Sequence, residues 1–295
     1  MRILILGGSG MLGHQLCRLL SDRMETWATF REMPADYDFL PKERTLDHVL
    51  VQDINRVQAI LDTVKPDAVV NAVGIVKQLE EAKDAVLSIQ VNALFPHQLA
   101  ELCSERNIRV FQISTDCVFS GSRGNYTEDD VPDPADLYGR TKLLGELNRP
   151  NCLTLRTSII GWELSTFSSL LSWFALQRGK SIMGYRRAIF SGISTKVLAN
   201  LIGDSIENRL DFEGLYHVAS APISKYDLLI QLRDALGWRD IFIEPDETYI
   251  CDRSLNGQRF NAATGWCAPG WDQMISGLAE QWPAYERWYT RYSKS

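Results

Sequence analysis

Features that would define several protein classes are scarce in this sequence of 295 residues. Basic residues do not predominate: Lys plus Arg total 31 against 37 for Asp plus Glu, which gives a formal net charge of -6. A negative chain has no overall electrostatic reason to bind nucleic acid or an anionic membrane surface. No apolar run approaches the ~18 residues that a membrane span needs. We therefore expect neither nucleic acid nor membrane as a partner.

Cysteine and histidine are few and scattered. The six cysteines contain no C-x-x-C pair, which predicts reduced and mostly buried thiols. The four histidines lack the spacing of metal ligands, so we expect no dedicated metal site. The initial MRILILGGSG carries an apolar stretch, but Gly-Gly interrupts it too early for a secretory signal. Together these features predict a cytoplasmic protein.

The first half of the chain alternates short apolar runs with amphipathic stretches. We expect strands at Ile3–Leu6, Glu25–Phe30, Ala68–Ala72, Arg109–Ser114 and Cys152–Arg156. We expect helices at Met11–Leu20 and Ala82–Arg106, with Pro96 as a candidate interruption of the second. Strands that alternate with helices indicate right-handed β-α-β units and a parallel sheet. The predicted fold class is α/β, a Rossmann doubly wound parallel sheet with a smaller C-terminal cap.

The C-terminal part differs in character, because it holds most of the tryptophans and several turn-rich segments. We predict a Rossmann domain at 1–160 that returns near 186–219, with a strand at about Leu215–Val218. Residues 161–185 and 220–295 would form a smaller substrate-binding cap. The length suits one large domain or two intimate ones.

A glycine-rich turn follows the first expected strand and opens the first expected helix. Its pattern is G-x-x-G-x-x-G, and the candidates for contact with a dinucleotide are Gly7, Gly10, Met11, Leu12 and Gly13. Glycine lets the backbone turn sharply and approach a pyrophosphate, while the helix N-terminus offers free N–H groups and partial positive charge. The strand–turn–helix context is what supports the motif.

The end of the second expected strand should distinguish NADP from NAD. Arg31 stands there, and a guanidinium suits a 2′-phosphate. Glu32 follows directly and could instead bind a ribose hydroxyl. We favour NADPH and leave NADH open.

Further cofactor contacts are expected at the carboxyl ends of parallel strands, where ligands of such sheets bind. Asp53 and Ile54 could meet the adenine ring. Small residues after the third expected strand, Asn71, Ala72, Val73 and Gly74, would let the cofactor lie close to the backbone. Ser114 ends the fourth strand in the same crevice.

The candidate catalytic residues are Thr115 at a strand end and the pair Tyr138 and Lys142 in a Y-x-x-x-K pattern. Residues i and i+4 share one face of a helix, so the phenol and the ammonium would project together. This suits ketone reduction, in which charge grows on the carbonyl oxygen and a proton donor is needed. We expect Lys142 to lower the tyrosine pKa and hold the nicotinamide ribose, and Thr115 to orient the carbonyl.

With these pieces the sequence resembles the extended short-chain dehydrogenases/reductases, and more narrowly the dTDP-4-dehydrorhamnose reductase family. The resemblance rests on GGSGMLG, NAVG, VNALFPHQLAELC, ISTDCVFSG, YTEDD, LYGRTKLLGE and LRTSIIG, and more loosely on DRSLNGQRF. It implies a Rossmann domain, NADPH or NADH, and reduction of the 4-keto group of a nucleotide-linked 6-deoxyhexose. It assigns the catalytic set to Thr115, Tyr138 and Lys142, and makes Asn92 a further cofactor candidate. Enzymes of such folds often pair, so a homodimer is an expectation.

Cys117 departs from the family pattern, in which tyrosine often follows the S-T-D tripeptide. The resemblance to GDP-fucose synthases offers an alternative, an epimerase/reductase in which this thiol acts as acid or base. That mechanism also needs a histidine partner, and 160–200 contains none. A second alternative is a non-catalytic NADP-binding regulatory subunit, like the methionine adenosyltransferase β subunit that these reductases resemble. A dehydratase is disfavoured, because it needs an acidic pair and only Asp116 is present.

Cationic side chains supply the remaining substrate candidates. Arg187, Arg253 and Arg259 are candidates for the substrate diphosphate, and Lys77 is a candidate for the sugar. Thr115, Asp116 and Cys117 would lie beside the reacting carbon.

Overall fold

A seven-stranded parallel sheet organises the computed structural model, which describes residues 1–78, 80–208 and 212–292. The strand order is β11-β6-β5-β4-β1-β2-β3. The strands are β1 (Arg2–Leu6), β2 (Glu25–Thr29), β3 (Thr45–Leu46), β4 (Ala68–Asn71), β5 (Arg109–Thr115), β6 (Cys152–Thr157) and β11 (Gly214–His217). The order reverses between β1 and β4, which is the switch point of a doubly wound sheet. The predicted fold class is confirmed.

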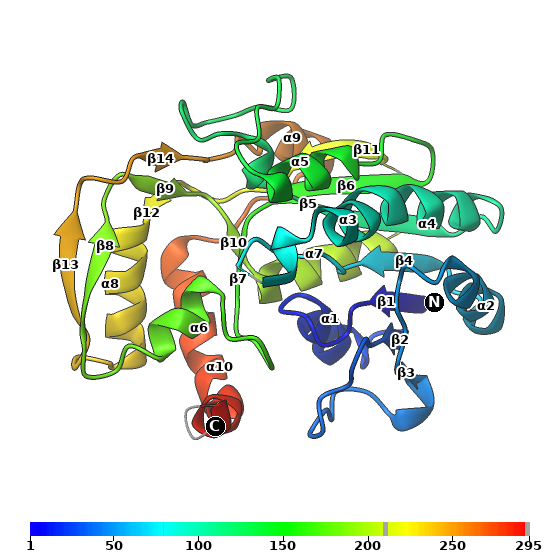
Figure 1. Ribbon diagram of the computed structural model, residues 1–295, viewed down its shortest axis with the longest axis horizontal. Helices are drawn as coiled ribbons and strands as arrows, with labels where there is room; N and C mark the ends of the chain where they lie inside the picture. The colour runs from blue at the N-terminus through cyan, green and yellow to red at the C-terminus, as the bar shows by residue number, and fades with distance from the viewer. Residues whose placement is uncertain (79, 209–211, 293–295) are drawn as a thin grey trace.

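Helices cover both faces of this sheet (Figure 1). They are α1 (Gly13–Leu20), α2 (Ile54–Val64), α3 (Ala85–Ser88), α4 (Phe95–Ser104), α5 (Leu137–Leu144) and α7 (Thr195–Glu207). The aliphatic run of β1 is fully buried because alternate side chains serve different faces. Ile3 and Ile5 join the core beneath α1 and α7, and Leu4 and Leu6 join the core beneath α2 and α4.

Among the described residues, the segments assigned to the predicted cap form small sheets and helices. Its strands are β7 (Ile159–Ile160), β8 (Ser181–Tyr185), β9 (Ala188–Phe190), β10 (Ile193–Ser194), β12 (Ile223–Ser224), β13 (Phe242–Asp246) and β14 (Cys251–Asp252). Its helices are α6 (Leu170–Ala175), α8 (Lys225–Leu236), α9 (Gln258–Thr264) and α10 (Trp271–Tyr292). Buried aromatic rings, including Trp162 and Trp238, form its core. In Figure 1, β8, β13 and α8 stand to the left of the large sheet.

The second long helical tract differs in detail from the prediction. It begins at Ala85, capped by Asp84, after a short 3₁₀ turn η2 (Glu80–Lys83). The tract passes through a π-helical stretch, η3 (Ile89–Leu94), before α4. Pro96 does not interrupt the tract, because it lies in the first turn of α4, where a missing N–H costs little. Short 3₁₀ turns also occur at η1 (Lys42–Arg44) and η4 (Asp116–Val118).

The two predicted domains share one hydrophobic core. The cluster beneath α1 and α7 continues into the cap through Trp162, Leu228 and Trp271. The return to the large sheet begins later than expected, since β9 pairs with β12 and β14 of the cap. The division into two domains therefore stays a proposal. None of the helices in the described ranges is both long and apolar enough to cross a membrane.

A substitution at Gly13 would show how closely α1 packs on the turn that precedes it. A Cβ at Gly13 would lie 1.9 Å from the carbonyl oxygen of Gly7. We expect Gly13→Ala to lower the free energy of unfolding by about 2 kcal/mol or more, because backbone must move. The matched control is Gly277→Ala inside α10, where a Cβ would meet no described atom within 4 Å outside its own helix. That change should stabilise by about 0.5–1 kcal/mol. Urea unfolding of both variants measures the difference, and equal stability of the two would contradict the packing argument.

Candidate active site

The turn between β1 and α1 provides a cradle for an anionic group. Gly7 has a φ of +87°, a conformation that favours glycine, and its N–H donates to Oγ1 of Thr29 at 3.3 Å. The residue that precedes α1, Leu12, supplies no side-chain cap, and no acidic residue occupies the first turn. By contrast, Asp53 caps α2 and Ser224 caps α8. The first turn of α1 thus keeps N–H donors that no capping side chain uses.

The loop after β4 lies directly against this cradle. A Cβ at Gly7 would come within 3.0 Å of Val73 and 3.4 Å of Ala72, so the two loops meet at the switch point. Gly74 faces Lys142, because a Cβ there would lie 3.8 Å from its Nζ. The structure thus brings together the glycine turn, the small residues 72–74 and Lys142. These residues fit a dinucleotide with its phosphates on the turn and its nicotinamide end near Lys142.

The predicted adenine and 2′-phosphate residues lie beyond β2 and β3. Arg31 is exposed, and its guanidinium lies 3.8 Å from a carboxylate oxygen of Glu81. Asp53 accepts from the N–H of Arg56 at 3.0 Å, so one of its oxygens caps α2. Ile54 packs against the core of that helix. Arg31 and Asp53 are both exposed, and Asp53 uses one carboxylate oxygen to cap α2.

Three other predicted cofactor residues use their side chains to hold the framework. Asn71 donates to Gln112 at 2.8 Å between β4 and β5. Asn92 bonds both backbone groups of Ile75, each at 2.9 Å, and thereby fixes the loop that carries Gly74. Ser114 donates to Glu146 at 2.6 Å. These side chains position the loops around the crevice.

Thr115, Tyr138 and Lys142 meet at the carboxyl end of β5. Thr115 is buried, accepts from the N–H of Cys117 at 3.1 Å and donates to Asp116 at 3.1 Å. Lys142 is buried on α5, and its Nζ donates to the carbonyl of Ile113 at 2.6 Å. Tyr138 is half-buried one turn earlier, and its phenol bonds with the Thr115 side chain. The helix that carries both residues is capped by Asp136.

The pKa of Tyr138 moves opposite to the expected direction. Burial raises it, the nearby Cys117 and Asp116 add to the rise, and the bond with Thr115 opposes it only in part. Lys142 is not among the groups that set this pKa. Burial lowers the pKa of Lys142 itself to about 8, with the negative charge of Glu146 acting against the change. The expectation of a lowered tyrosine pKa was therefore wrong for the protein by itself, because burial of the phenol outweighs the groups that would lower its pKa.

A buried ion pair beneath these residues was missed by the sequence reasoning. Glu146, just past α5, and Arg156 of β6 make two hydrogen bonds of 2.7 Å, and both side chains are buried. Glu146 also accepts from Ser114. His217 of β11 lies beside Arg156, and burial lowers its pKa to about 4, so it is neutral near pH 7. Neither member of the ion pair has a local sequence signal, since they come from different elements.

The predicted substrate residues divide into two groups. Lys77 and Arg253 lie within electrostatic range of the buried Asp116 and Cys117. Burial raises the pKa of Asp116, and it raises that of Cys117 to about 12. Arg259 lies elsewhere, because it pairs with Asp129 at 2.5 Å. Lys77 and Arg253 therefore lie close enough to the catalytic segment to act on it electrostatically.

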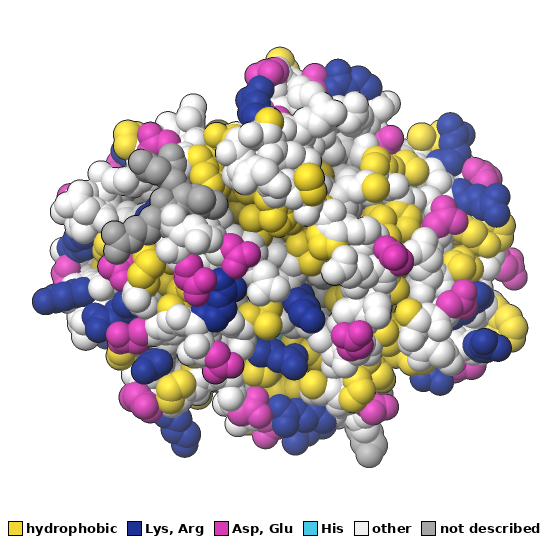
Figure 2. Space-filling model, turned by 180° about the vertical axis from the view of Figure 1, so that it is seen from behind, with side chains coloured by type: hydrophobic (Ala, Val, Ile, Leu, Met, Phe, Trp, Pro, Cys, Tyr) yellow, Lys and Arg dark blue, Asp and Glu magenta, His cyan; other side chains and the backbone are white. Residues whose placement is uncertain are grey.

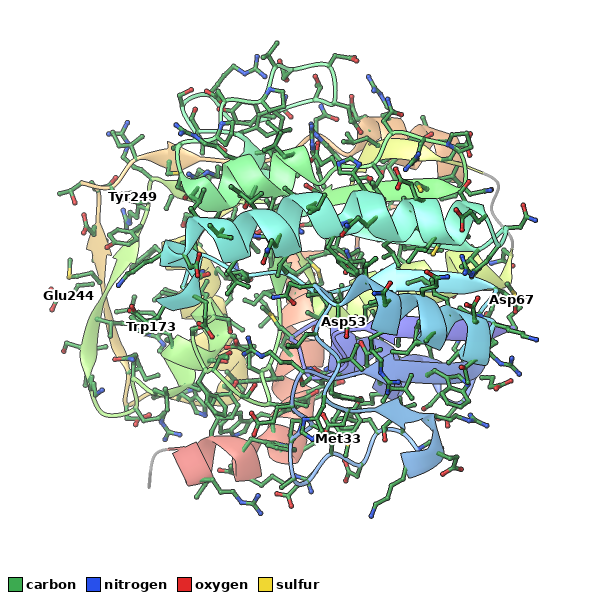
Figure 3. All side chains as sticks on the ribbon, turned by 45° about the vertical axis from the view of Figure 1, so that its right-hand side comes forward. Met33, Asp53, Asp67, Trp173, Glu244 and Tyr249 are labelled. Atoms are coloured by element: carbon green, nitrogen blue, oxygen red, sulfur yellow. The ribbon has the colours of Figure 1, made fainter. Side chains whose placement is uncertain are left out.

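The third arginine predicted for the diphosphate, Arg187, and two residues that the sequence did not indicate, Lys225 and Tyr249, also belong to the cap side. Arg187 is exposed, and its carbonyl accepts from the N–H of Cys251 at 3.0 Å. Lys225, at the start of α8, interacts electrostatically with Asp116, and Tyr249 interacts with Cys117. Figure 3 shows Tyr249 and Trp173 on the cap side, while Asp53 and Met33 lie on the Rossmann side. Residues of the predicted cap, Lys225 and Tyr249, thus contribute to the crevice beside Asp116 and Cys117.

Charge elsewhere on the molecule is mixed. On the face in Figure 2, basic and acidic side chains are interspersed. A surface hollow of about 600 Å³ between α8 and α10 is lined by the carboxylates Asp234, Asp272 and Glu280, which would repel an anionic nucleotide. Within the described residues no group of three or more His, Cys, Asp and Glu side chains is arranged to hold a metal.

Comparisons with known proteins agree with this geometry. The family model for the RmlD substrate binding domain matches residues 1–248. A dTDP-4-dehydrorhamnose reductase of Aggregatibacter actinomycetemcomitans is 26% identical over 79% of this chain and 78% of its own length. A probable low-salt glycan biosynthesis reductase of Haloferax volcanii is 30% identical, covering 84% of this chain and 85% of that relative.

Among solved structures, the dTDP-4-dehydrorhamnose reductase of Bacillus anthracis in complex with NADP superposes with a TM-score of 0.77. It is 20% identical, and the match covers 95% of this chain and 99% of that one. This likeness concerns the fold, whereas the family model and the relatives concern the sequence. The chain therefore belongs to the RmlD family of extended short-chain dehydrogenases/reductases.

Proposed function

We propose that this protein is an NADPH-dependent reductase of the 4-keto group of a nucleotide-linked 6-deoxyhexose. The observation that carries the proposal is the convergence of Thr115, Tyr138 and Lys142 beside the loop that faces the glycine turn. Relatives named dTDP-4-dehydrorhamnose reductase and dTDP-4-keto-6-deoxy-D-glucose reductase support the substrate class. The decisive assay mixes protein, NADPH and dTDP-4-keto-6-deoxy sugars and follows the absorbance of the cofactor.

Tyr138 is the proton donor in this proposal. Its raised pKa keeps the phenol protonated at neutral pH, which is the state that reduction requires. Thr115 has a single hydroxyl proton, now directed to Asp116. A substrate carbonyl that replaces Asp116 as acceptor would receive that hydrogen bond, and the oxygen would then be held by two hydroxyls. The proton passes from the Tyr138 oxygen to the carbonyl oxygen.

Lys142 would hold the nicotinamide ribose and stabilise the tyrosinate that remains after transfer. One of its three N–H donors is used by Ile113, and two remain. NADPH, when bound, supplies the hydride. Glu146 faces the ammonium and favours its charged form, so the buried ion pair with Arg156 supports the charge on which this role depends.

The glycine turn and the N-terminus of α1 would bind the pyrophosphate, with Gly7, Gly10, Met11, Leu12 and Gly13 as its contacts. Arg31 is proposed to bind the 2′-phosphate, which favours NADPH over NADH. Its 3.8 Å contact with Glu81 is exposed and therefore weak, so a phosphate could displace it.

Both alternatives from the sequence are less well supported. An epimerase that uses Cys117 needs a thiol that ionises, whereas burial and Asp116 raise the pKa of this thiol to about 12. A non-catalytic subunit has no need for a buried ammonium one helical turn from a phenol. We therefore retain the reductase.

Two finer expectations stay predictions. The first is that the protein forms a homodimer. The helical segments beside the large sheet expose apolar side chains that could pack against a second copy: Val86, Ile89, Leu94 and Leu144. A cytoplasmic location is the other. Sedimentation equilibrium of the purified chain decides the first.

Replacing Tyr138 by Phe should lower kcat by about 10²–10⁴-fold, because the proton donor is lost while the ring remains. NADPH affinity and the melting temperature should change little. The matched control is Tyr216→Phe. Tyr216 lies on β11, and its ring packs against Phe212 and Phe260. Steady-state kinetics measures both variants, and a Tyr138→Phe enzyme of full kcat would rule out the assigned donor.

Lys142 should give the reaction an alkaline limit. Since its pKa is about 8 in the free protein, the ammonium is charged below that pH and neutral above it, so kcat/KM should fall as pH rises through about 8. The Tyr138 phenol stays protonated over this range because its pKa is raised. Lys142→Arg keeps its charge beyond pH 12 and should flatten the profile at a lower rate. An unchanged alkaline limb in that variant would assign the titration to another group.

Arg31→Ala should weaken NADPH binding by about tenfold and leave NADH binding nearly unchanged, because a single charge-assisted contact is lost. Arg178→Ala is the control, since this exposed arginine of the cap also pairs with a carboxylate, Asp240. Fluorescence titration with each cofactor gives the ratio. Equal losses for the two cofactors would exclude a specific role in 2′-phosphate recognition.

A further inference from the structure

Three cations from separate segments surround the crevice beside Cys117. Lys77 follows β4, Lys225 begins α8, and Arg253 follows β14. Each interacts electrostatically with Asp116, the one carboxylate that these groups share. Within the described part of the chain, no ion pair involves any of the three. A local excess of positive charge in a chain of net charge -6 indicates an anionic ligand.

Lys225 and Arg253 follow the two outer strands of one small three-stranded sheet. Ser224 of β12 and Asp252 of β14 both pair with Ile189, from opposite sides of β9. Because β12 runs antiparallel to β9 and β14 runs parallel to it, the chain leaves β12 toward Ala188 and leaves β14 toward Phe190. The long side chains of Lys225 and Arg253 therefore start from opposite ends of one small sheet, and both interact with Asp116. The side chain of Arg253 is held by a 2.9 Å bond from Nε to the carbonyl of Phe119. Its terminal nitrogens are thereby directed by the segment that carries Cys117.

The charged form of Lys225 is destabilised by its surroundings, and a bound anion would stabilise it. It is half-buried, and burial together with repulsion from Lys77 lowers its pKa. Asp116 acts against this lowering but does not cancel it, and the two negative charges of a diphosphate would stabilise both ammonium groups.

An aromatic pair lies at the outer edge of the same cluster. The rings of Tyr185 and Tyr249 are 5.1 Å apart, and the two side chains remain 38% and 47% exposed. Tyr249 also interacts with Cys251 and with Arg253. Large aromatic rings left exposed beside cations suit a ligand with a flat ring and a phosphate. Figure 3 shows Tyr249 at the rim of the cap.

We propose that Lys225 is a substrate-binding residue that holds the diphosphate of a nucleotide-linked sugar together with Lys77 and Arg253, while the base of the nucleotide stacks on the Tyr185–Tyr249 pair. The inference rests on the proposed function and assigns Lys225 and the two tyrosines to its substrate. The base and the diphosphate would lie on the cap, and the sugar would extend past Cys117 toward Tyr138.

The test is calorimetric binding of dTDP, UDP, GDP and thymidine to the full chain. Lys225→Gln should weaken nucleoside diphosphate binding by about tenfold, equivalent to about 1.4 kcal/mol, and leave thymidine binding unchanged. Lys225→Arg should restore most of the affinity. Tyr249→Ala should weaken nucleoside and nucleoside diphosphate by a similar factor, and Tyr249→Phe should not.

Lys196→Gln is the matched control, because this lysine is also half-buried in the first turn of a helix, α7, but faces away from the crevice. It should bind nucleotides as the wild type does. NADPH affinity and melting temperature, measured on every variant, should stay constant and so exclude misfolding. If the wild type binds a nucleoside diphosphate and Lys225→Gln binds it equally well, this inference is overturned and the proposed function stands. If the wild type binds none of the three, both fall.

Discussion

The buried ion pair between Glu146 and Arg156 is the contact on which the catalytic geometry depends. It joins the end of α5 to β6, and the bond from Ser114 adds β5 to the same network. Removing one partner of such a pair leaves an uncompensated buried charge, which costs about 3–5 kcal/mol in comparable proteins. Because Thr115 follows Ser114 and Lys142 precedes Glu146 by one turn, the network sets the position of both.

The cap and the nucleotide-binding half are coupled through a second buried network. Nδ1 of His14 lies 2.8 Å from the carbonyl of Gly10, and its Nε2 lies 2.7 Å from the hydroxyl of Tyr285 in α10. The carbonyl can only accept, so Nδ1 carries the proton and Nε2 accepts from the tyrosine. Burial lowers the pKa of His14 to about 4, which keeps the ring neutral. Through His14, a hydrogen bond from α10, some 270 residues later in the chain, helps to hold the glycine turn in place.

Prediction from the sequence succeeded where the signal is local. Continuous aliphatic runs such as that of β1 identify strands buried on both faces, and the glycine turn gives the first β-α unit. The spacing of Tyr138 and Lys142 follows from helix geometry alone. Sequence reasoning did not identify the partners of the Asn92 and Ser114 side chains, which are distant in sequence, and their cofactor contacts stay a prediction. It also failed for the Tyr138 pKa, since burial and the direction of the Lys142 ammonium are properties of the packed molecule.

The sequence by itself determined the α/β class, the positions of five strands along the chain and the candidate chemistry, because periodicity and short motifs depend on neighbouring residues. Only the tertiary structure decided which cations face the crevice. Lys225 and Arg253 follow the two outer strands of a three-stranded sheet and both interact with Asp116, whereas Arg259 pairs with Asp129. The physical reason is that electrostatic partners are chosen by distance in space, and the chain brings residues from three distant segments to one point.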